Sequence, residues 1–200
     1  MKIGLCGTMS VGKTTLVNAL KELPEFADYN FATERSKYLR DLGIPLNTDS
    51  TLKGQTIFLA ERCSELMREN VITDRTIIDV MSFAKCADSI HDEYKEAFIK
   101  YAAPLIWEYD YIFYVSPVGV DIEDNGVRET NADYRKLIDI TIKGTINENL
   151  NHIQNFGIIA GDTEGRIKQK ELTLSQKLEE TQRKKNEADA IRENLTSQLE

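Results

Sequence analysis

The sequence predicts an α/β fold, with a five-stranded parallel sheet that carries helices on both faces. Short runs rich in β-branched or aromatic residues alternate with stretches of helical periodicity, which is the pattern of parallel strands joined by helical crossovers. A glycine-rich loop follows the first of these runs and leads into a helix. The chain has 200 residues, of which 41% are hydrophobic, and so it can bury one sizeable core.

Each predicted element has a local signal. Strands are expected at Lys2–Cys6, Tyr29–Ala32, Asn70–Thr73, Tyr111–Val115 and Gly157–Ala160. Two long helices are expected at Leu52–Glu69 and Asn131–Ile153, because apolar residues recur there on one stripe that we expect to face the core. The stripe residues are Leu59, Cys63 and Leu66 in the first helix, and Ile138, Ile142, Ile146, Leu150 and Ile153 in the second.

The composition changes near Gly165, where apolar residues become sparse and Lys, Arg, Glu and Gln dominate. We therefore expect one domain over residues 1–166 and a long charged C-terminal helix over residues 167–200. Its incomplete apolar stripe fits either a single exposed helix or a helix that mediates homo-oligomerisation or partner binding.

Charge and composition exclude several classes of protein. A net charge of −8 gives no support for a general binder of the nucleic-acid backbone, although a local basic groove remains compatible with it. Candidates for such a groove are Arg35, Arg75, Arg128 and Arg166. No secretory signal and no apolar run of membrane-spanning length are evident. The three cysteines lack zinc-ligand or CxxC spacing, so we expect reduced thiols in a cytoplasmic protein that does not associate with membranes.

The loop after the first strand matches the phosphate-binding pattern GxxxxGK[ST], in the segment Gly7-Thr8-Met9-Ser10-Val11-Gly12-Lys13-Thr14. Its two glycines permit a tight turn whose backbone N–H groups point into one anion-binding concavity, and the following helix adds its dipole. Lys13 supplies a cation for the β- and γ-phosphates of ATP, and the Thr14 hydroxyl is a candidate ligand of Mg²⁺. The sequence therefore predicts a P-loop NTPase fold.

Acidic and basic residues follow the next two strands. Glu34-Arg35 comes after the second strand, which we expect to adjoin the first, and Asp74-Arg75 comes after the third. Glu34 and Asp74 are both candidates for the base that activates an attacking hydroxyl, and Asp74 also for the carboxylate that organises magnesium. Arg75 is a candidate phosphate clamp. A helix-capping role for Glu34 and a structural ion pair for Asp74 and Arg75 stay open.

A long polar loop after the fourth strand, over residues 116–130, is a lid candidate. Arg128 lies within it and would reach the phosphates on closure. Excluding water in this way favours transfer to a bound acceptor over hydrolysis. An ordinary acidic surface loop is the alternative.

These residues together resemble a known family. The set comprises Gly7–Thr15, Glu34-Arg35, Gln55, the segment from Asp74 to Asp79, the segment from Asp124 to Arg128, and Ala160-Gly161-Asp162. It resembles the AAA-type ATPase/kinase family that includes ribosylnicotinamide kinase domains, and more distantly the deoxynucleoside kinases. Related P-loop kinases include bacteriophage 5-hydroxymethyluracil DNA kinases. The resemblance covers roughly residues 1–166.

The resemblance implies a role for each matching position. It implies an ATP site at Gly7–Thr15, with Thr15 included, and a base or magnesium organiser at Glu34 or Asp74. It also implies a phosphate clamp at Arg75 and a lid arginine at Arg128. Gln55 is placed like the helix glutamine that pairs with the nucleobase in deoxynucleoside kinases. The loop from Gly161 to Arg166 would border the adenine. Apart from the resemblance, Arg35 is a candidate to hold Glu34 or a substrate phosphate in place.

The sequence departs from the family in one respect. The Glu34-Arg35-Ser36 triplet follows the second predicted strand, whereas the corresponding triplet of deoxynucleoside kinases follows the third. Homologous roles for these residues are therefore not carried over.

Two functions compete. The first is an ATP-dependent kinase acting on a nucleoside, a nucleotide or a modified base in DNA. The second is an ATP-controlled binding module or ATPase whose C-terminal helix recruits a partner. A signalling GTPase is disfavoured, because no guanine-reading Asn-Lys-x-Asp follows a late strand.

Overall fold

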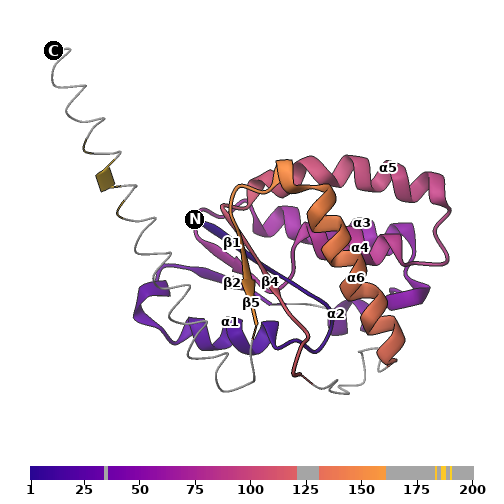
Figure 1. Ribbon diagram of the computed structural model, residues 1–200, viewed down its shortest axis with the longest axis horizontal. Coiled ribbons are helices and arrows are strands. Elements are labelled where there is room, and N and C mark those ends of the chain that lie inside the picture. The colour runs from indigo at the N-terminus through magenta and orange to yellow at the C-terminus, as the bar shows by residue number, and fades with distance from the viewer. Residues whose placement is uncertain (34–35, 121–130, 161–182, 184–185, 188–189, 191–200) are drawn as a thin grey trace, which may run out of the picture.

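Five parallel strands form one sheet in the order β2-β3-β1-β4-β5 (Figure 1). The strands are β1 (Lys2–Cys6), β2 (Asn30–Ala32), β3 (Val71–Thr73), β4 (Tyr111–Val115) and β5 (Phe156–Ile159). All neighbouring pairs are parallel, and in the register Gly4 pairs with Thr73 on one side and Ile112 on the other. The predicted α/β fold with a five-stranded parallel sheet is confirmed, with strand starts that differ from the prediction by one residue at β2, β3 and β5.

The computed structural model describes residues 1–33, 36–120 and 131–160, and in the C-terminal segment only residues 183, 186–187 and 190. The predicted C-terminal helix and the domain boundary at residue 166 therefore lie almost wholly outside the described residues. The helices are α1 (Lys13–Lys21), α2 (Ser36–Asp41), α3 (Leu52–Glu65), α4 (Ile77–Lys85), α5 (Asp92–Ala102) and α6 (Ala132–Glu148). Short 3-10 helices cover Pro24–Phe26, Asn47–Asp49, Ala103–Glu108 and Leu150–His152.

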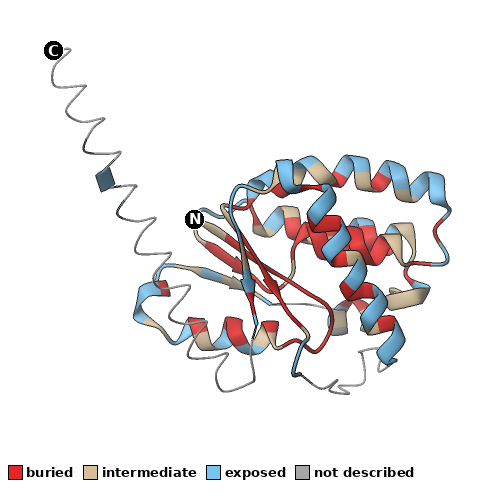
Figure 2. Cartoon of the chain, in the orientation of Figure 1, coloured by how far each residue is buried: buried red, intermediate tan, exposed pale blue. Residues whose placement is uncertain are grey.

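Helices cover both faces of the sheet, because successive strand residues point to opposite sides. Ile3 and Leu5 of β1 pack on the face covered by α1, whereas Cys6 packs on the face covered by α3, α4 and α6. Buried residues lie along the strands and on the inner sides of the helices (Figure 2). The predicted helices on both faces are confirmed.

The order of the strands corrects one expectation. β2 lies at the edge of the sheet and pairs with β3, so it does not adjoin the strand that leads into the phosphate loop. Burial gives the physical reason. Val71 and Ile72 of β3 are fully buried, which suits a central strand, whereas Asn30 of β2 is exposed, which suits an edge. The strand that flanks the phosphate loop strand on this side is therefore β3, which carries Asp74-Arg75.

Two helix predictions were too long. The first helix ends at Glu65 and the second at Glu148, where Asn149 forms the C-cap. The chain then turns into a 3-10 helix, which takes Leu150 off the apolar stripe and leaves it 54% exposed. The expectation that Leu150 belongs to the core is therefore wrong. Helix α5 was not predicted, because its charged sequence buries only Phe98 and Ala102.

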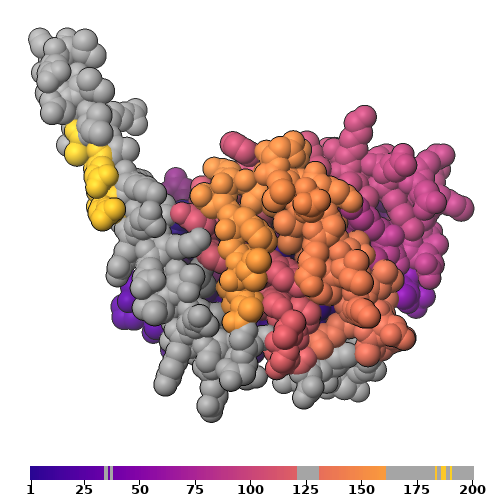
Figure 3. Space-filling view, in the orientation of Figure 1, coloured from indigo at the N-terminus to yellow at the C-terminus, as the bar shows by residue number. Residues whose placement is uncertain are grey.

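Among the residues that the structure describes, every helix is too short or too polar to cross a bilayer. Helix α6 and strand β5 occupy the middle of the face seen in the space-filling view (Figure 3). Both elements carry exposed apolar residues, among them Ile140 of α6 and Ile158 of β5.

Candidate active site

The phosphate loop is shaped by three residues with positive φ angles. Gly7 (φ 153°) approaches Val115 so closely that a Cβ atom there would lie 2.6 Å from the Val115 carbonyl oxygen. Gly12 (φ 79°) forms the N-cap of α1, and Ser10 adopts φ 55°, which a non-glycine residue seldom does. The loop therefore curls over the first turn of α1, where helix N–H groups and the helix dipole favour an anion.

Two side chains at the start of α1 complete this loop. Lys13 is only 6% exposed, and its ammonium group donates to the carbonyl oxygens of Gly7 (2.6 Å) and Thr8 (2.9 Å). The Thr14 hydroxyl donates to Asp74 Oδ2 at 2.5 Å. Thr15 is exposed. The contact between Thr14 and Asp74 joins the first turn of α1 to the residue that follows β3, two segments for which the sequence predicted roles in binding ATP and magnesium.

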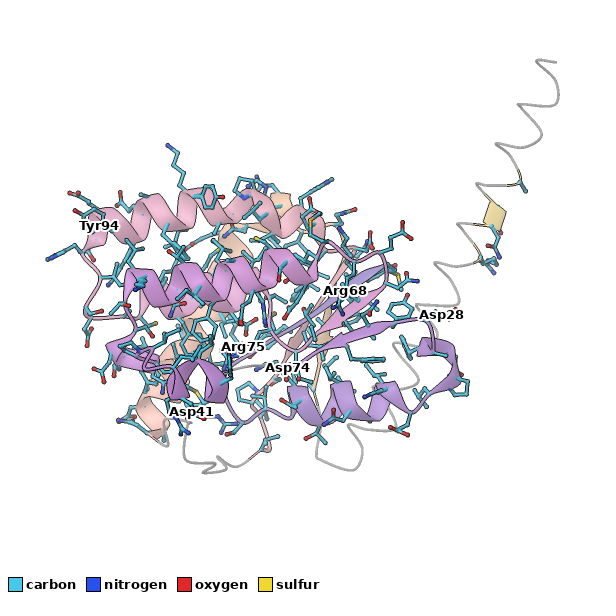
Figure 4. The ribbon with its side chains drawn as sticks, turned by 180° about the vertical axis from the view of Figure 1, so that it is seen from behind. Asp28, Asp41, Arg68, Asp74, Arg75 and Tyr94 are labelled. Carbon is cyan, nitrogen blue, oxygen red and sulfur yellow. The ribbon has the colours of Figure 1, made fainter. Side chains whose placement is uncertain are left out.

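A pocket opens where these groups meet. Asp74 and Arg75 lie side by side at the carboxyl end of β3 (Figure 4). The pocket is lined by Met9, Ser10, Val11, Gly12, Lys13, Thr14, Asp74 and Arg75. It thus presents two cations and a helix N-terminus together with one carboxylate, a set suited to a phosphate chain accompanied by a metal ion.

The residues present fit a magnesium ion with few protein ligands. Magnesium usually keeps several waters and is held by one or two protein oxygens plus phosphate oxygens. Thr14 and Asp74 would be the residues that hold it. Within the described ranges, no group of three or more His, Cys, Asp or Glu gathers as a larger metal cage.

Asp79 links the phosphate loop to the turn after β3. Its carboxylate is fully buried and accepts from the Gly7 N–H (3.0 Å) and from the N–H and hydroxyl of Thr76 (both 2.8 Å). The bond from the Thr76 N–H is one half of a capping box at the start of α4, in which the Thr76 side chain in turn accepts from the Asp79 N–H. One carboxylate therefore fixes the first residue of the loop relative to the Asp74-Arg75 turn.

Sequence reasoning gave no role to Asp79 and missed Arg135, which bonds to the loop from α6. A Thr-x-x-Asp spacing at the predicted helix start was the available signal for Asp79. Arg135 lies in the first turns of α6, where a cation opposes the helix dipole. That unfavourable placement was the only local sign of a tertiary role.

The remaining predicted residues divide into two groups. Arg75 lies in the pocket, and its guanidinium is 4.9 Å from the centre of the Phe83 ring. Gln55 is 3% exposed on α3 and is not among the residues that line the pocket. Glu34, Arg35, Arg128 and the loop from Gly161 to Arg166 lie outside the described residues.

The cysteines are poor candidates for nucleophiles. Cys6, directly before the loop, is buried. Its burial and, to a smaller extent, the charge of Asp79 raise the pKa of its thiol well above the ordinary value. Burial also raises the thiol pKa of Cys63 and of Cys86. All three therefore stay protonated near neutral pH, and the pocket does not include them.

The fold and the phosphate loop define a P-loop protein of the α/β class. The chain belongs to the AAA domain family, because the model of that family matches residues 2–166. A search of curated protein sequences returned no match.

Solved structures with a similar fold include two kinds of protein. Deoxyadenosine kinase from M. mycoides with bound dCTP is 18% identical, with a TM-score of 0.63 over 88% of this chain and 100% of that chain. NadR protein in complex with NR is 18% identical, with a TM-score of 0.60 over 80% of this chain and 46% of that chain. This chain therefore spans less than half of NadR. At these identities the likeness shows the shared fold.

Proposed function

We propose that this chain is an ATP-dependent kinase whose acceptor is a hydroxyl group of a nucleoside, a nucleotide or a modified base in DNA. The observation that carries the proposal is the contact between Thr14 and Asp74 in a pocket that also contains Lys13 and Arg75. A phosphate loop alone fits any NTPase. A carboxylate and an arginine on the adjoining strand supply the further groups that phosphoryl transfer needs.

The similar structures support the nucleotide part of this proposal. One is described as a deoxyadenosine kinase and is recorded with bound dCTP and with bound dATP. NadR is recorded in complex with NAD and AMP-PNP. Both kinds of protein therefore bind nucleotides, and one is a kinase by its description.

We assign the following roles. The loop N–H groups and Lys13 bind the phosphates, while Thr14 and Asp74 hold Mg²⁺, which when bound offsets phosphate charge. Arg75 steadies the transferring group. Because Asp74 already accepts from the Thr14 hydroxyl, its geometry favours the magnesium role over the base. Glu34 is then the candidate base, Arg128 the arginine of the closing segment, and Gln55 and Arg35 the acceptor-side contacts.

The proposal is tested with purified protein, Mg²⁺ and γ-labelled ATP against a panel of nucleosides, nucleotides and hydroxymethylated DNA. We expect label in at least one acceptor, and none when Lys13→Ala protein replaces the wild type. Label in hydroxymethylated DNA but not in nucleosides, falling as salt rises, would identify a DNA base as the acceptor. Binding of ATP without transfer to any panel member would contradict the kinase proposal.

The two candidate bases are separated by their amides. Asp74→Asn should raise the magnesium concentration needed for half-maximal turnover, because a metal-holding oxygen is lost. Glu34→Gln should lower kcat at an unchanged magnesium requirement and remove the acidic limb of the pH profile, because the amide takes up no proton. The opposite pattern would make Asp74 the base.

A binding module or ATPase that recruits a partner through residues 167–200 remains a prediction, as does the cytoplasmic location. Removing that segment should then lower the number of copies in the assembly in solution. An unchanged number of copies would reject self-association through it.

A further inference from the structure

Arg135 reaches from α6 to main-chain oxygens of two other segments. Its guanidinium donates from Nε to the Met9 carbonyl (3.2 Å), from Nη2 to the Ser10 carbonyl (3.3 Å) and from Nη1 to the Val120 carbonyl (2.8 Å). In the opposite sense, the buried Thr8 hydroxyl donates to the main-chain oxygen of Arg135 at 3.1 Å. Residue 135 thus bonds to the phosphate loop through both its side chain and its backbone.

The planarity of the peptide unit gives these bonds a consequence inside the pocket. In a trans peptide the C=O and the following N–H point in opposite directions. When the carbonyls of Met9 and Ser10 point at Arg135, the N–H groups of Ser10 and Val11 must point away from it. Met9, Ser10 and Val11 all line the pocket. Arg135 therefore lies on the carbonyl side of these two peptide units, opposite to their N–H groups.

The same segment contains an unfavourable backbone angle. Ser10 has φ 55°, a conformation that non-glycine residues adopt only when the surroundings hold them there. The peptide units on both sides of the Ser10 Cα are the two whose carbonyls accept from Arg135. Hydrogen bonds from a charged donor are stronger than neutral ones, so this residue can hold the loop in its binding shape.

We propose that Arg135 is a positioning residue for the phosphate loop, which orients the Ser10 and Val11 N–H groups toward the phosphates of the nucleotide. It acts through the loop backbone and also ties the loop to the turn at Pro117–Val120 after β4. The inference rests on the nucleotide-binding part of the proposed function. Three different nitrogens of the guanidinium fork donate to three different carbonyls, which the single nitrogen of lysine cannot reproduce.

The first test measures the loop without nucleotide. Backbone ¹⁵N relaxation should show rigid Ser10 and Val11 amides in the wild type, with order parameters of about 0.85, and values below about 0.6 in Arg135→Ala. Lys136→Ala is the matched control, because it removes a neighbouring exposed cation from the same helix. Its loop should stay rigid. Equal order parameters in Arg135→Ala and the wild type would overturn the inference.

The second test measures binding of Mg-ATP by calorimetry. We expect Kd to rise about tenfold or more in Arg135→Ala, by less in Arg135→Lys, and not at all in Lys136→Ala. Millimolar guanidinium ion should restore part of the affinity of Arg135→Ala and leave the control unchanged. If Arg135→Ala does not fold, Arg135→Lys serves in both tests, and a rigid loop with unchanged affinity in it would reject the inference.

The two proposals fail in different ways. A wild type that binds ATP but transfers phosphate to no acceptor, with arginine variants that bind ATP less tightly, would reject the proposed kinase activity and leave the role of Arg135 intact. A wild type that binds ATP, with arginine variants that bind it equally well, would reject the role of Arg135 alone.

Discussion

The face of the sheet that packs against α1 is filled by apolar side chains, whereas the face that packs against α3, α4 and α6 also buries polar groups. On the α1 face the core consists of residues such as Leu5, Leu16 and Phe113. On the opposite face, Asp79 accepts from Gly7 and Thr76, and the Tyr114 hydroxyl donates to Asp139 at 2.6 Å. The phosphate loop, which follows β1, contacts core residues on both faces of the sheet.

The two sides contribute differently to the phosphate loop. Helix α1 supplies the cation Lys13 and the hydroxyl of Thr14, the residue proposed to hold magnesium. Helices α4 and α6 supply its shape, through Asp79 and Arg135. Substitutions on the α1 side should therefore alter nucleotide chemistry with little change in stability, while substitutions on the other side should alter both.

The largest expected effect is that of Lys13→Ala. Under the proposed function, removing the cation assigned to the phosphates should lower turnover on the order of 10²–10³-fold and weaken ATP binding. Steady-state kinetics and calorimetry measure both, and the melting temperature should change little. Lys21→Ala, at the exposed end of the same helix, is the control and should behave as the wild type. Wild-type turnover in Lys13→Ala would reject the phosphate-loop assignment.

Asp79→Ala tests the opposite side of the loop. The substitution leaves the Gly7 N–H and the Thr76 N–H buried without their acceptor, so we expect about 2–3 kcal/mol lower stability together with weaker ATP binding. Denaturant unfolding and nucleotide titration measure the two effects. Asp79→Asn, which keeps the shape and one acceptor oxygen, should fall between Asp79→Ala and the wild type.

The result for Asp79→Ala decides whether the α4 and α6 side of the loop affects nucleotide binding as well as stability. A variant that loses stability but binds ATP as tightly as the wild type would show that the carboxylate only caps α4. In that case the shape of the loop would not depend on this face of the sheet.

Much of the α1 side could be predicted from the sequence, because its signals are local. The phosphate loop is one contiguous segment, and strand β1 ends where its apolar run ends. The sequence also placed Asp74 and Arg75 at the carboxyl end of a parallel strand, the edge of the sheet at which the loop lies, although it expected β2 to be the neighbour of β1. These predictions needed no knowledge of distant contacts.

The other side could not be predicted in the same way. Gly7 and Asp79 are 72 residues apart, and Met9 and Arg135 are 126 apart, so nothing local pairs them. The edge position of β2, next to β3, likewise depends on the folded sheet, because the more buried strand takes the central place. Propensity and periodicity carry no information about such long-range pairings.

Two glycines give a smaller test of the same comparison. An added Cβ at Gly4 would lie 2.5 Å from Thr76 Cγ2, on the face with the capping box, and one at Gly157 would lie 2.7 Å from the Phe113 ring, on the α1 face. We expect Gly4→Ala to cost about 1–3 kcal/mol, because Thr76 is held by Asp79. Gly157→Ala should cost less, because β5 is an edge strand that can shift.

Thermal unfolding measures both variants against Gly144→Ala. A Cβ at Gly144 meets open space within helix α6, so that variant should gain about 0.5–1 kcal/mol. A larger loss at Gly157 than at Gly4 would show that the apolar face is the more rigid of the two.

The smallest expected effect concerns alkaline pH. Burial raises the pKa of Tyr29, beside the α1 face, to about 12, and burial together with the bond to Asp139 raises the pKa of Tyr114, on the polar face, still further. An unfolded tyrosine ionises near pH 10. Because the folded-state pKa values are higher, the stability these groups contribute is present in full below about pH 10 and is lost as pH rises above it.

Tyr114→Phe and Tyr29→Phe compare how the two faces contribute to the loss of stability at alkaline pH. At neutral pH it should lower stability by about 1 kcal/mol, because the bond to Asp139 is lost. Above about pH 10 its stability should fall less steeply than that of the wild type, because one raised pKa has been removed. Tyr29→Phe should change the slope only between about pH 10 and the Tyr29 pKa of about 12. Denaturant unfolding across this range, with tyrosinate absorbance followed in parallel, measures the slopes. Parallel curves for Tyr114→Phe and the wild type would mean that the Tyr114 hydroxyl ionises without opening the polar face.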